Sequence, residues 1–144
     1  MSTIHDVLGR KGGTVHTVDS SVSVLDAIKT MFEVNIGALV IQDDDQLVGM
    51  FTERDYLRKI VLKGRSSSTT AVADVMSSPL ITIDIGEPVH VAMEIMTECR
   101  CRHLVVMDNE TMAGIVSLGD MVKHCLQDKE AEVEQLSSYI AGSY

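Results

Sequence analysis

The sequence predicts a mixed α/β fold built from two similar halves, and two observations lead to this prediction. Shifting the chain by 65 positions aligns residues 15–61 with residues 80–126 without a gap, with identical pairs such as Asp55/Asp120. Each half also contains an amphipathic segment with helical spacing, followed by two short apolar runs that polar residues separate. Self-similarity at a fixed period indicates two copies of one supersecondary unit.

Each copy is expected to fold in the order β-α-β-β-α. In the first copy the expected elements are a strand at 14–18, a helix carrying Val24, Ala27, Ile28, Met31 and Phe32, strands at 38–41 and 47–51, and a helix at 54–62. In the second copy they are a strand at 80–83, a helix opened by Pro88, strands at 104–107 and 112–116, and a helix at 119–126. The strands are apolar enough to be covered on both faces, which favours two repeats that pack through their sheets.

The repeat boundaries divide the chain into four parts. These are a first repeat with an N-terminal lead-in helix at 1–64, a Ser/Thr-rich linker at 65–71, a second repeat at 72–127, and a C-terminal helix at 128–144. The lead-in at 4–8 matches the lead-in at 72–76. The C-terminal helix is expected to present the apolar residues Val133, Leu136 and Ile140 to a partner.

Composition excludes several classes of function. A net charge of −9 argues against a nucleic-acid partner, whose phosphates would repel the protein. No apolar run reaches the ~20 residues that a membrane span needs, and the N-terminus has no signal-peptide pattern. We therefore expect a cytoplasmic protein, or one inside an organelle if a transit peptide has been removed. Three cysteines without framework spacing favour a reducing compartment, and Cys99-x-Cys101 beside His103 matches no common zinc pattern, so no metal site is expected.

Basic residues are concentrated in two places. Five of the twelve Lys and Arg residues lie within twelve positions: Arg54, Arg58, Lys59, Lys63 and Arg65. Arg100, Arg102 and His103 form a smaller group in the second repeat. Such clusters in an acidic protein suggest an anion site, although a solvated helix face is the other interpretation.

One motif occurs at the end of the third expected strand of each repeat. It reads Gly-φ-φ-[Thr/Ser]-x-x-Asp, where φ is apolar, at residues 49–55 and 114–120. A hydroxyl followed three residues later by an acid is typical of a capping box at a helix start. A capped helix N-terminus is also a place where phosphates bind, so the motif suits a nucleotide as well as a cap.

The duplication and this motif together resemble the cystathionine-β-synthase (CBS) domain pair. The resemblance covers nearly the whole chain and is closest to small CBS-pair proteins of bacteria and plant organelles, which share runs such as Thr52-Glu53-Arg54-Asp55-Tyr56. It implies two repeats related by a pseudo-twofold axis, with two clefts between them that bind adenosyl ligands: AMP, ADP, ATP, NAD or S-adenosylmethionine.

The resemblance also implies roles for individual residues. Thr52 and Ser117 would bind phosphate or ribose, and Asp55 and Asp120 would accept hydrogen bonds from the ribose hydroxyls. The basic side chains Arg54, Arg102 and His103 are the expected phosphate partners. The full expected binding set is Ile36, Gly37, Ala38, Thr52, Arg54, Asp55, Lys59, Arg65, Thr82, Arg102, His103, Ser117 and Asp120. The two clefts are not expected to be equivalent, because Gly37-Ala38 stands in one repeat where Arg102-His103 stands in the other.

These observations predict a regulatory module, not an enzyme, because the chain offers no nucleophile–base pair and no metal cluster. It would bind AMP or NAD(H), with ADP and ATP next and S-adenosylmethionine last, sense energy or redox state, and signal to a partner protein as a homodimer. The alternative is a constitutive interaction or dimerisation module with no functional ligand.

Overall fold

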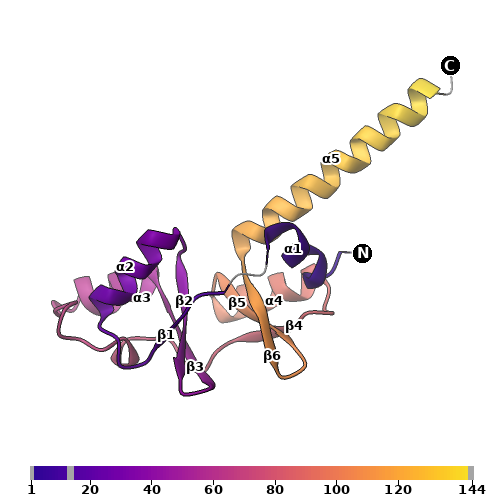
Figure 1. Ribbon diagram of the computed structural model, residues 1–144. Coiled ribbons are helices and arrows are strands. Elements are labelled where there is room, and N and C mark those ends of the chain that lie inside the picture. Colours follow the sequence, from indigo (N-terminus) through magenta and orange to yellow (C-terminus); the bar gives the residue numbers. More distant parts are fainter. Residues whose placement is uncertain (1, 13–14, 143–144) are drawn as a thin grey trace. The chain divides into compact units, whose positions relative to one another are not determined.

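The computed structural model describes residues 2–12 and 15–142, with side chains through residue 130 (Figure 1). In chain order its elements are α1 (Ile4–Lys11), β1 (Thr17–Asp19), α2 (Val24–Val34), β2 (Ala38–Asp43), β3 (Gln46–Thr52), α3 (Glu53–Asp55), the π-helix η1 (Tyr56–Val61), the 3₁₀-helix η2 (Val72–Asp74), β4 (Thr82–Asp84), α4 (Val89–Cys99), β5 (His103–Asp108), β6 (Thr111–Ser117) and α5 (Leu118–Gly142). The chain forms two compact units. We call 14–81 the first-repeat unit, and 1–13 with 82–144 the second-repeat unit.

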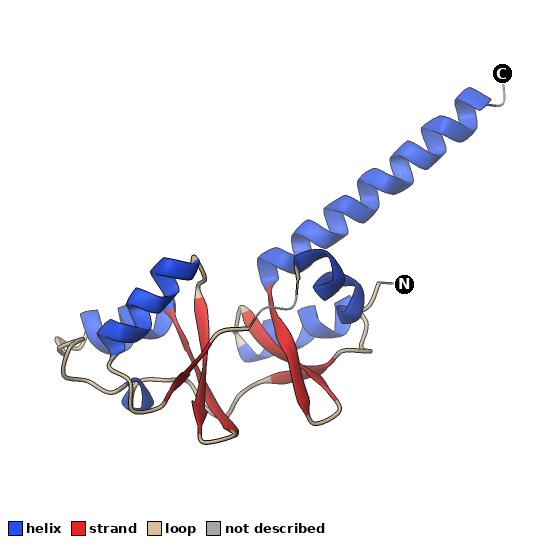
Figure 2. Cartoon of the chain, in the orientation of Figure 1, coloured by secondary structure: helices blue, strands red, loops and turns tan. Residues whose placement is uncertain are grey.

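Each unit contains one three-stranded mixed sheet flanked by helices (Figure 2). In the first-repeat unit β1 runs parallel to β2, and β2 runs antiparallel to β3. The second-repeat unit repeats this arrangement with β4, β5 and β6. Val40 pairs with Thr17 and Met50, and the equivalent Val105 pairs with Thr82 and Ile115. The hydrogen-bond register therefore reproduces the 65-residue repeat, and the predicted mixed α/β fold is confirmed.

The equivalent helices α2 and α4 also end at equivalent positions of the repeat. The hydroxyl of Ser23 caps α2 by accepting a hydrogen bond from the Asp26 amide at 3.1 Å. Asn35 follows α2 and Arg100 follows α4 as the C-cap, and both residues have left-handed backbone conformations, with φ of 56° and 54°. A left-handed residue at this position ends a helix by turning the chain away from its axis.

The central strand of each sheet is the centre of its unit's core. Leu39, Val40 and Ile41 of β2 are fully buried, and so are the equivalent Leu104, Val105 and Val106 of β5. Strands covered on both faces are apolar at successive positions rather than at alternate ones. Burial of both faces of the central strands therefore explains the continuous apolar runs in the sequence.

The two lead-in segments are exchanged between the repeats. Residues 2–12 precede the first repeat in sequence, but they pack into the second-repeat unit, where α1 lies beside the first turns of α5 (Figure 1). Residues 72–81 likewise pack into the first-repeat unit. The packing units therefore differ from the sequence boundaries expected at residues 64 and 72.

The glycine of the repeated motif accommodates this exchange. A Cβ atom on Gly49 would lie 2.6 Å from Sδ of Met76 and 2.9 Å from the carbonyl oxygen of Ser77. A Cβ atom on Gly114 would lie 2.9 Å from Cδ2 of Leu8. Leu8 and Met76 occupy matching positions in the two lead-ins. Glycine therefore stands where each sheet is crossed by the lead-in that precedes the other repeat.

The C-terminal region differs from the sequence-based expectation. Two helices were expected, at 119–126 and from residue 128, but α5 is one helix over Leu118–Gly142. No glycine or proline separates the two expected segments, so nothing in the sequence interrupts the helix. The side chains of Val133, Leu136 and Ile140 lie outside the described part of the structure. None of the helices in the described residues is long and apolar enough to span a membrane.

Candidate functional site

The repeated motif forms a capping box in both units. In the first-repeat unit the Thr52 amide donates to Oδ2 of Asp55 at 3.0 Å, and the Asp55 amide donates to Oγ1 of Thr52 at 3.3 Å. In the second-repeat unit the Ser117 amide donates to Oδ2 of Asp120 at 2.8 Å, and the Asp120 amide donates to the Ser117 hydroxyl at 3.0 Å. The sequence-based interpretation as a helix cap is therefore correct.

The sheet register brings the second group of expected binding residues beside each cap. Ala38 pairs with Thr52, and the Glu53 amide donates to the Gly37 carbonyl at 3.3 Å. His103 pairs with Ser117 in the equivalent position, and the Leu118 amide donates to the Arg102 carbonyl at 2.8 Å. The expected binding residues therefore gather into two sets, one in each unit.

In the second-repeat unit these residues open onto a groove of about 720 Å³ along α5. Arg102, His103 and Ser117 line the groove, together with Leu118, Gly119, Val122, Lys123, Leu126, Gln127 and Glu130. The basic residues and the hydroxyl lie where α5 begins. From there Leu118, Val122 and Leu126 form an apolar stripe with side chains 39%, 46% and 59% exposed. These α5 residues were not among the binding residues expected from the sequence, although their i, i+4 spacing is visible there.

Asp120 is hydrogen-bonded to Ser117 of this groove, and a residue from the lead-in also binds it. The ammonium of Lys11 donates to Oδ2 of Asp120 at 2.6 Å and to the carbonyl oxygen of Ile115 at 2.7 Å. Burial of Asp120 disfavours its charge, but the hydrogen bonds from Lys11 and Ser117 outweigh burial and lower its pKa. Sequence analysis missed Lys11, because its role depends on the exchange of the lead-ins.

Asp55, the equivalent carboxylate, is buried and receives donors on both oxygens. Its Oδ2 accepts from the amide of Thr52 at 3.0 Å and from the Thr52 hydroxyl at 3.1 Å. Its Oδ1 accepts from the Ser77 hydroxyl at 2.8 Å and lies 3.1 Å from Nζ of Lys59. Lys59 also donates to the Val75 carbonyl at 2.9 Å, so its ammonium holds the lead-in and Asp55 together.

The remaining expected residues are distributed over both units. Ile36 packs against the core of the first-repeat unit, and Arg54 is exposed in the first turn after the cap. Arg65 is exposed beyond η1, and its amide donates to the Ile60 carbonyl at 3.0 Å. Thr82 begins β4 in the second-repeat unit, where it pairs with Val105.

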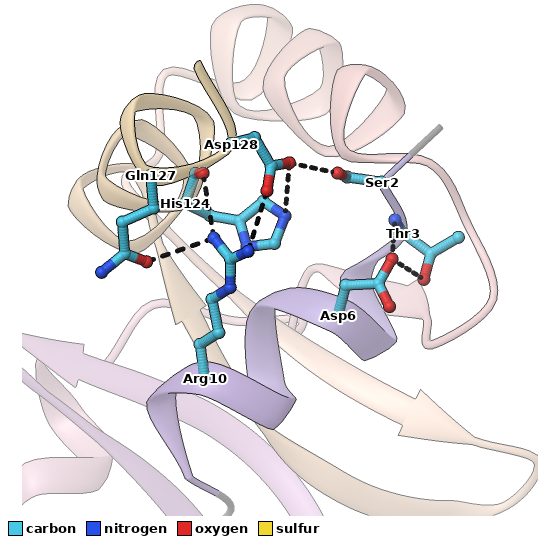
Figure 3. Close-up of polar contacts among 7 residues, drawn as sticks. All are labelled: Ser2, Thr3, Asp6, Arg10, His124, Gln127 and Asp128. Carbon is cyan, nitrogen blue, oxygen red and sulfur yellow. Dashed lines mark hydrogen bonds and ion pairs between the residues drawn. The ribbon is translucent and has the colours of Figure 1, made fainter. Parts of the chain in front are cut away.

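A polar cluster holds α1 against α5 in the second-repeat unit (Figure 3). Asp128 accepts from the Ser2 hydroxyl at 2.6 Å and from Nη2 of Arg10 at 2.9 Å. Nη1 of Arg10 donates to the His124 carbonyl and to Oε1 of Gln127, both at 3.3 Å. The hydrogen bond from Ser2 and the charges of His124 and Arg10 outweigh burial and lower the pKa of Asp128.

His124 is buried beneath this cluster, with 3% of its surface exposed. Its Nε2 lies 3.2 Å from Oδ2 of Asp128, a distance that allows an ion pair when the ring is protonated. Among the residues that the structure describes, neither ring nitrogen has a hydrogen-bond partner of good geometry. Buried polar groups are usually hydrogen-bonded, so this buried imidazole is an exception.

The cysteines are free thiols in the structure. Cys99 is exposed, and Cys101 is partly buried, which raises the pKa of its thiol. Among the side chains described in residues 2–12 and 15–130, no three His, Cys, Asp or Glu residues come together as a metal site.

Comparison with known proteins adds independent evidence. The family model for the CBS domain matches residues 5–62 and 72–127. The mitochondrial CBS domain-containing protein CBSX3 of Arabidopsis thaliana is 40% identical over 154 aligned positions, which cover 99% of this chain and 74% of the relative. The CBS domain-containing protein YhcV of Bacillus subtilis is 29% identical and is covered over 92% of its length.

A solved structure is similar to this chain in fold as well as in sequence. The CBS-domain protein from Burkholderia ambifaria is 40% identical and superimposes with a TM-score of 0.85, over 88% of this chain and 96% of that one. Modules of this family are typically regulatory and bind adenine nucleotides or related ligands. Two matched domains, the repeated fold and these similarities show that the chain belongs to the CBS-domain family, as a pair of CBS domains in tandem.

Proposed function

We propose that this CBS pair is a regulatory module that binds an adenine nucleotide of the AMP or NAD type and signals its occupancy to a partner protein. The observation that carries the proposal is the convergence of Arg102, His103 and Ser117 where α5 begins, with the Asp120 carboxylate hydrogen-bonded to Ser117. Phosphate and ribose are adjacent in such ligands, and these groups suit both.

The phosphate would bind at the start of α5. A helix N-terminus carries a partial positive charge, which favours an anion. Arg102 and His103 add basic side chains at the same point, and the Ser117 hydroxyl adds a donor. The groove volume of about 720 Å³ is within the range of roughly 300–1,000 Å³ that small-molecule sites occupy.

The ribose would bind at Asp120, since a carboxylate can accept both hydroxyls of a vicinal diol with charge-assisted hydrogen bonds. The side chain of Asp120 is 23% exposed, whereas that of Asp55 is 8% exposed and already receives four donors. We therefore infer that the second-repeat unit contains the tighter site. The residues of the first-repeat unit, with Thr52 as their cap, would form a weaker one.

The charge of this region selects among adenosyl ligands. AMP and NAD(H) carry phosphate next to the ribose, where Arg102 and His103 converge. ADP and ATP carry further negative charge and rank next. S-adenosylmethionine carries a positive sulfonium at this position, so it ranks last.

A titration-calorimetry panel of AMP, NAD(H), ATP, adenosine and S-adenosylmethionine tests the proposal. AMP is expected to bind more tightly than adenosine, and Arg102→Ala should weaken AMP binding while leaving adenosine binding nearly unchanged. The affinity for AMP should also fall as salt rises, because partly exposed charge pairs are screened. Tighter binding of S-adenosylmethionine than of AMP, or equal binding of AMP and adenosine, would contradict it.

One observation favours a second role in self-association. The stripe of Leu118, Val122 and Leu126 is exposed, and the first-repeat unit exposes Leu57 and Val61 at positions equivalent to Val122 and Leu126. Exposed apolar stripes on helices favour a partner surface, and a twofold homodimer is the commonest arrangement. Sedimentation should show a dimer that Val122→Glu converts to the 15.7-kDa monomer. If this dimer forms but no adenylate binds, the chain is a constitutive dimerisation module instead.

A further inference from the structure

The two exchanged lead-ins contact the motif aspartates in equivalent but chemically different ways. In the first-repeat unit Ser77 donates from its amide to the Met50 carbonyl at 2.8 Å and from its hydroxyl to Asp55 at 2.8 Å. In the second-repeat unit Lys11 donates to the Ile115 carbonyl at 2.7 Å and to Asp120 at 2.6 Å. Met50 and Ile115 are equivalent, as are the two aspartates. One ammonium therefore makes both of the contacts that a backbone amide and a hydroxyl make in the other repeat.

These two arrangements differ in how readily they can open. Ser77 is fixed by its backbone, because its carbonyl also accepts from the Met50 amide at 2.9 Å. Lys11 reaches Asp120 only through a flexible side chain, which is 38% exposed. An ammonium on a four-carbon stem can turn into solvent, where it is strongly hydrated, without movement of the backbone. The contact at Asp120 is therefore releasable, whereas the backbone bridge between Ser77 and Met50 keeps the Ser77 hydroxyl beside Asp55.

Release of Lys11 would change how many hydrogen bonds the Asp120 carboxylate can accept from a ribose. Each carboxylate oxygen can accept about two hydrogen bonds. Oδ2 of Asp120 accepts from the Ser117 amide and from Lys11, so both of its positions are occupied. A ribose diol that donates to both carboxylate oxygens must therefore replace Lys11 on Oδ2.

We propose that Lys11 is a gate on Asp120, so that a ribose diol binds this carboxylate only in exchange for the ammonium. This proposal depends on the proposed adenylate site. It adds Lys11 as a residue that sets the affinity of that site for the ribose. The exchange would also break the hydrogen bond between the last turn of α1 and β6, because Lys11 holds the Ile115 carbonyl with the same ammonium. Arg10 in the same turn would still bind Asp128 of α5, and so would Ser2 before the start of α1 (Figure 3).

The test compares adenosine binding to the wild type and to Lys11→Met by titration calorimetry. Adenosine is the probe because it has the diol but no phosphate, so losing a positive charge does not weaken its attraction to the site. Lys11→Met should bind adenosine at least about threefold more tightly, and Lys11→Arg should bind like the wild type. The matched control is Lys29→Met, which removes one positive charge from an exposed position of α2 in the first-repeat unit.

A second measurement reports the exchange itself. Saturating adenosine should speed amide hydrogen exchange in the last turn of α1 in the wild type, and should have no such effect in Lys11→Met. Adenosine binding to Lys11→Met that is no tighter than wild-type binding, or that is undetectable in both proteins, overturns the gate. AMP binding to the wild type then decides separately whether the proposed function stands.

Discussion

The ammonium of Lys11 lies 2.6 Å from Oδ2 of Asp120, although 109 residues separate them in the chain. This ion pair joins the segment that precedes the first repeat to the motif that ends the last strand of the second. The same carboxylate caps α5 through Ser117 and is the proposed ribose acceptor. Folding, capping and the proposed ligand binding therefore depend on one side chain.

The Asp120 contacts should make stability depend on pH in the acid range. Lys11 and Ser117 hold the pKa of Asp120 below its ordinary value of 3.8. A lowered pKa in the folded state contributes stability that is present above the unfolded-state pKa and is lost as the pH falls through the folded-state pKa. The free energy of unfolding of the wild type should therefore exceed that of Asp120→Asn at pH 6, and this difference should shrink at pH 3. Urea titrations of both proteins at both pH values measure this difference in the free energy of unfolding. An equal difference at pH 6 and pH 3 would show that the fold does not stabilise the ionised form of Asp120.

The two motif aspartates should differ when each is replaced by alanine. Asp120→Ala should weaken adenylate binding by about 1–3 kcal/mol, the usual contribution of a lost hydrogen bond to a charged group. Asp55→Ala should instead lower stability, because it leaves Ser77 and Lys59 without their acceptor and removes a cap that contributes about 1 kcal/mol. Calorimetry on folded variants and urea unfolding separate the two effects. A large loss of affinity in Asp55→Ala with intact stability would reverse the assignment of the tighter site.

The motif glycines should tolerate alanine unequally. A Cβ on Gly49 would approach the backbone oxygen of Ser77 to 2.9 Å, and this oxygen is fixed by its hydrogen bond to the Met50 amide. A Cβ on Gly114 would approach only the side chain of Leu8, at 2.9 Å, which can adjust. Overpacking usually costs about 1–3 kcal/mol. Gly49→Ala should therefore destabilise the protein more than Gly114→Ala in thermal unfolding, and the opposite order would contradict the account of the exchanged lead-ins.

Replacing the buried His124 by leucine should leave stability unchanged or raise it. The imidazole is buried without a well-formed hydrogen bond in the described residues, and a buried unsatisfied polar group costs about 1–3 kcal/mol. Asp128 keeps its contacts with Ser2 and Arg10 in His124→Leu. Urea unfolding at pH 7 is the measurement. A loss of more than about 2 kcal/mol would mean that the pairing of His124 with Asp128 stabilises the fold.

The sequence alone determined the features of this protein that depend on residues close together in the chain. The 65-residue repeat predicted the strands of both sheets, and the structure reproduces it in the register of Val40 and Val105. The motif predicted both capping boxes, because a hydroxyl and an acid three residues apart can only satisfy each other at a helix start. The sequence also brought Arg102 and His103 beside Ser117, since an antiparallel hairpin pairs the start of its first strand with the end of its second.

Only the tertiary structure decided which lead-in packs on which repeat. Residues 4–8 and 72–76 resemble each other, and this resemblance does not say which sheet each segment packs on. The contact between Lys11 and Asp120 spans 109 residues, which is not a multiple of the 65-residue repeat. The structure likewise turned Lys59 toward Asp55 and Val75, although its place in a basic cluster suggested a phosphate. Capping and strand pairing follow from backbone geometry over a few residues. Contacts across more than a hundred residues follow from how preformed elements fill each other's surfaces, which here required a glycine at positions 49 and 114.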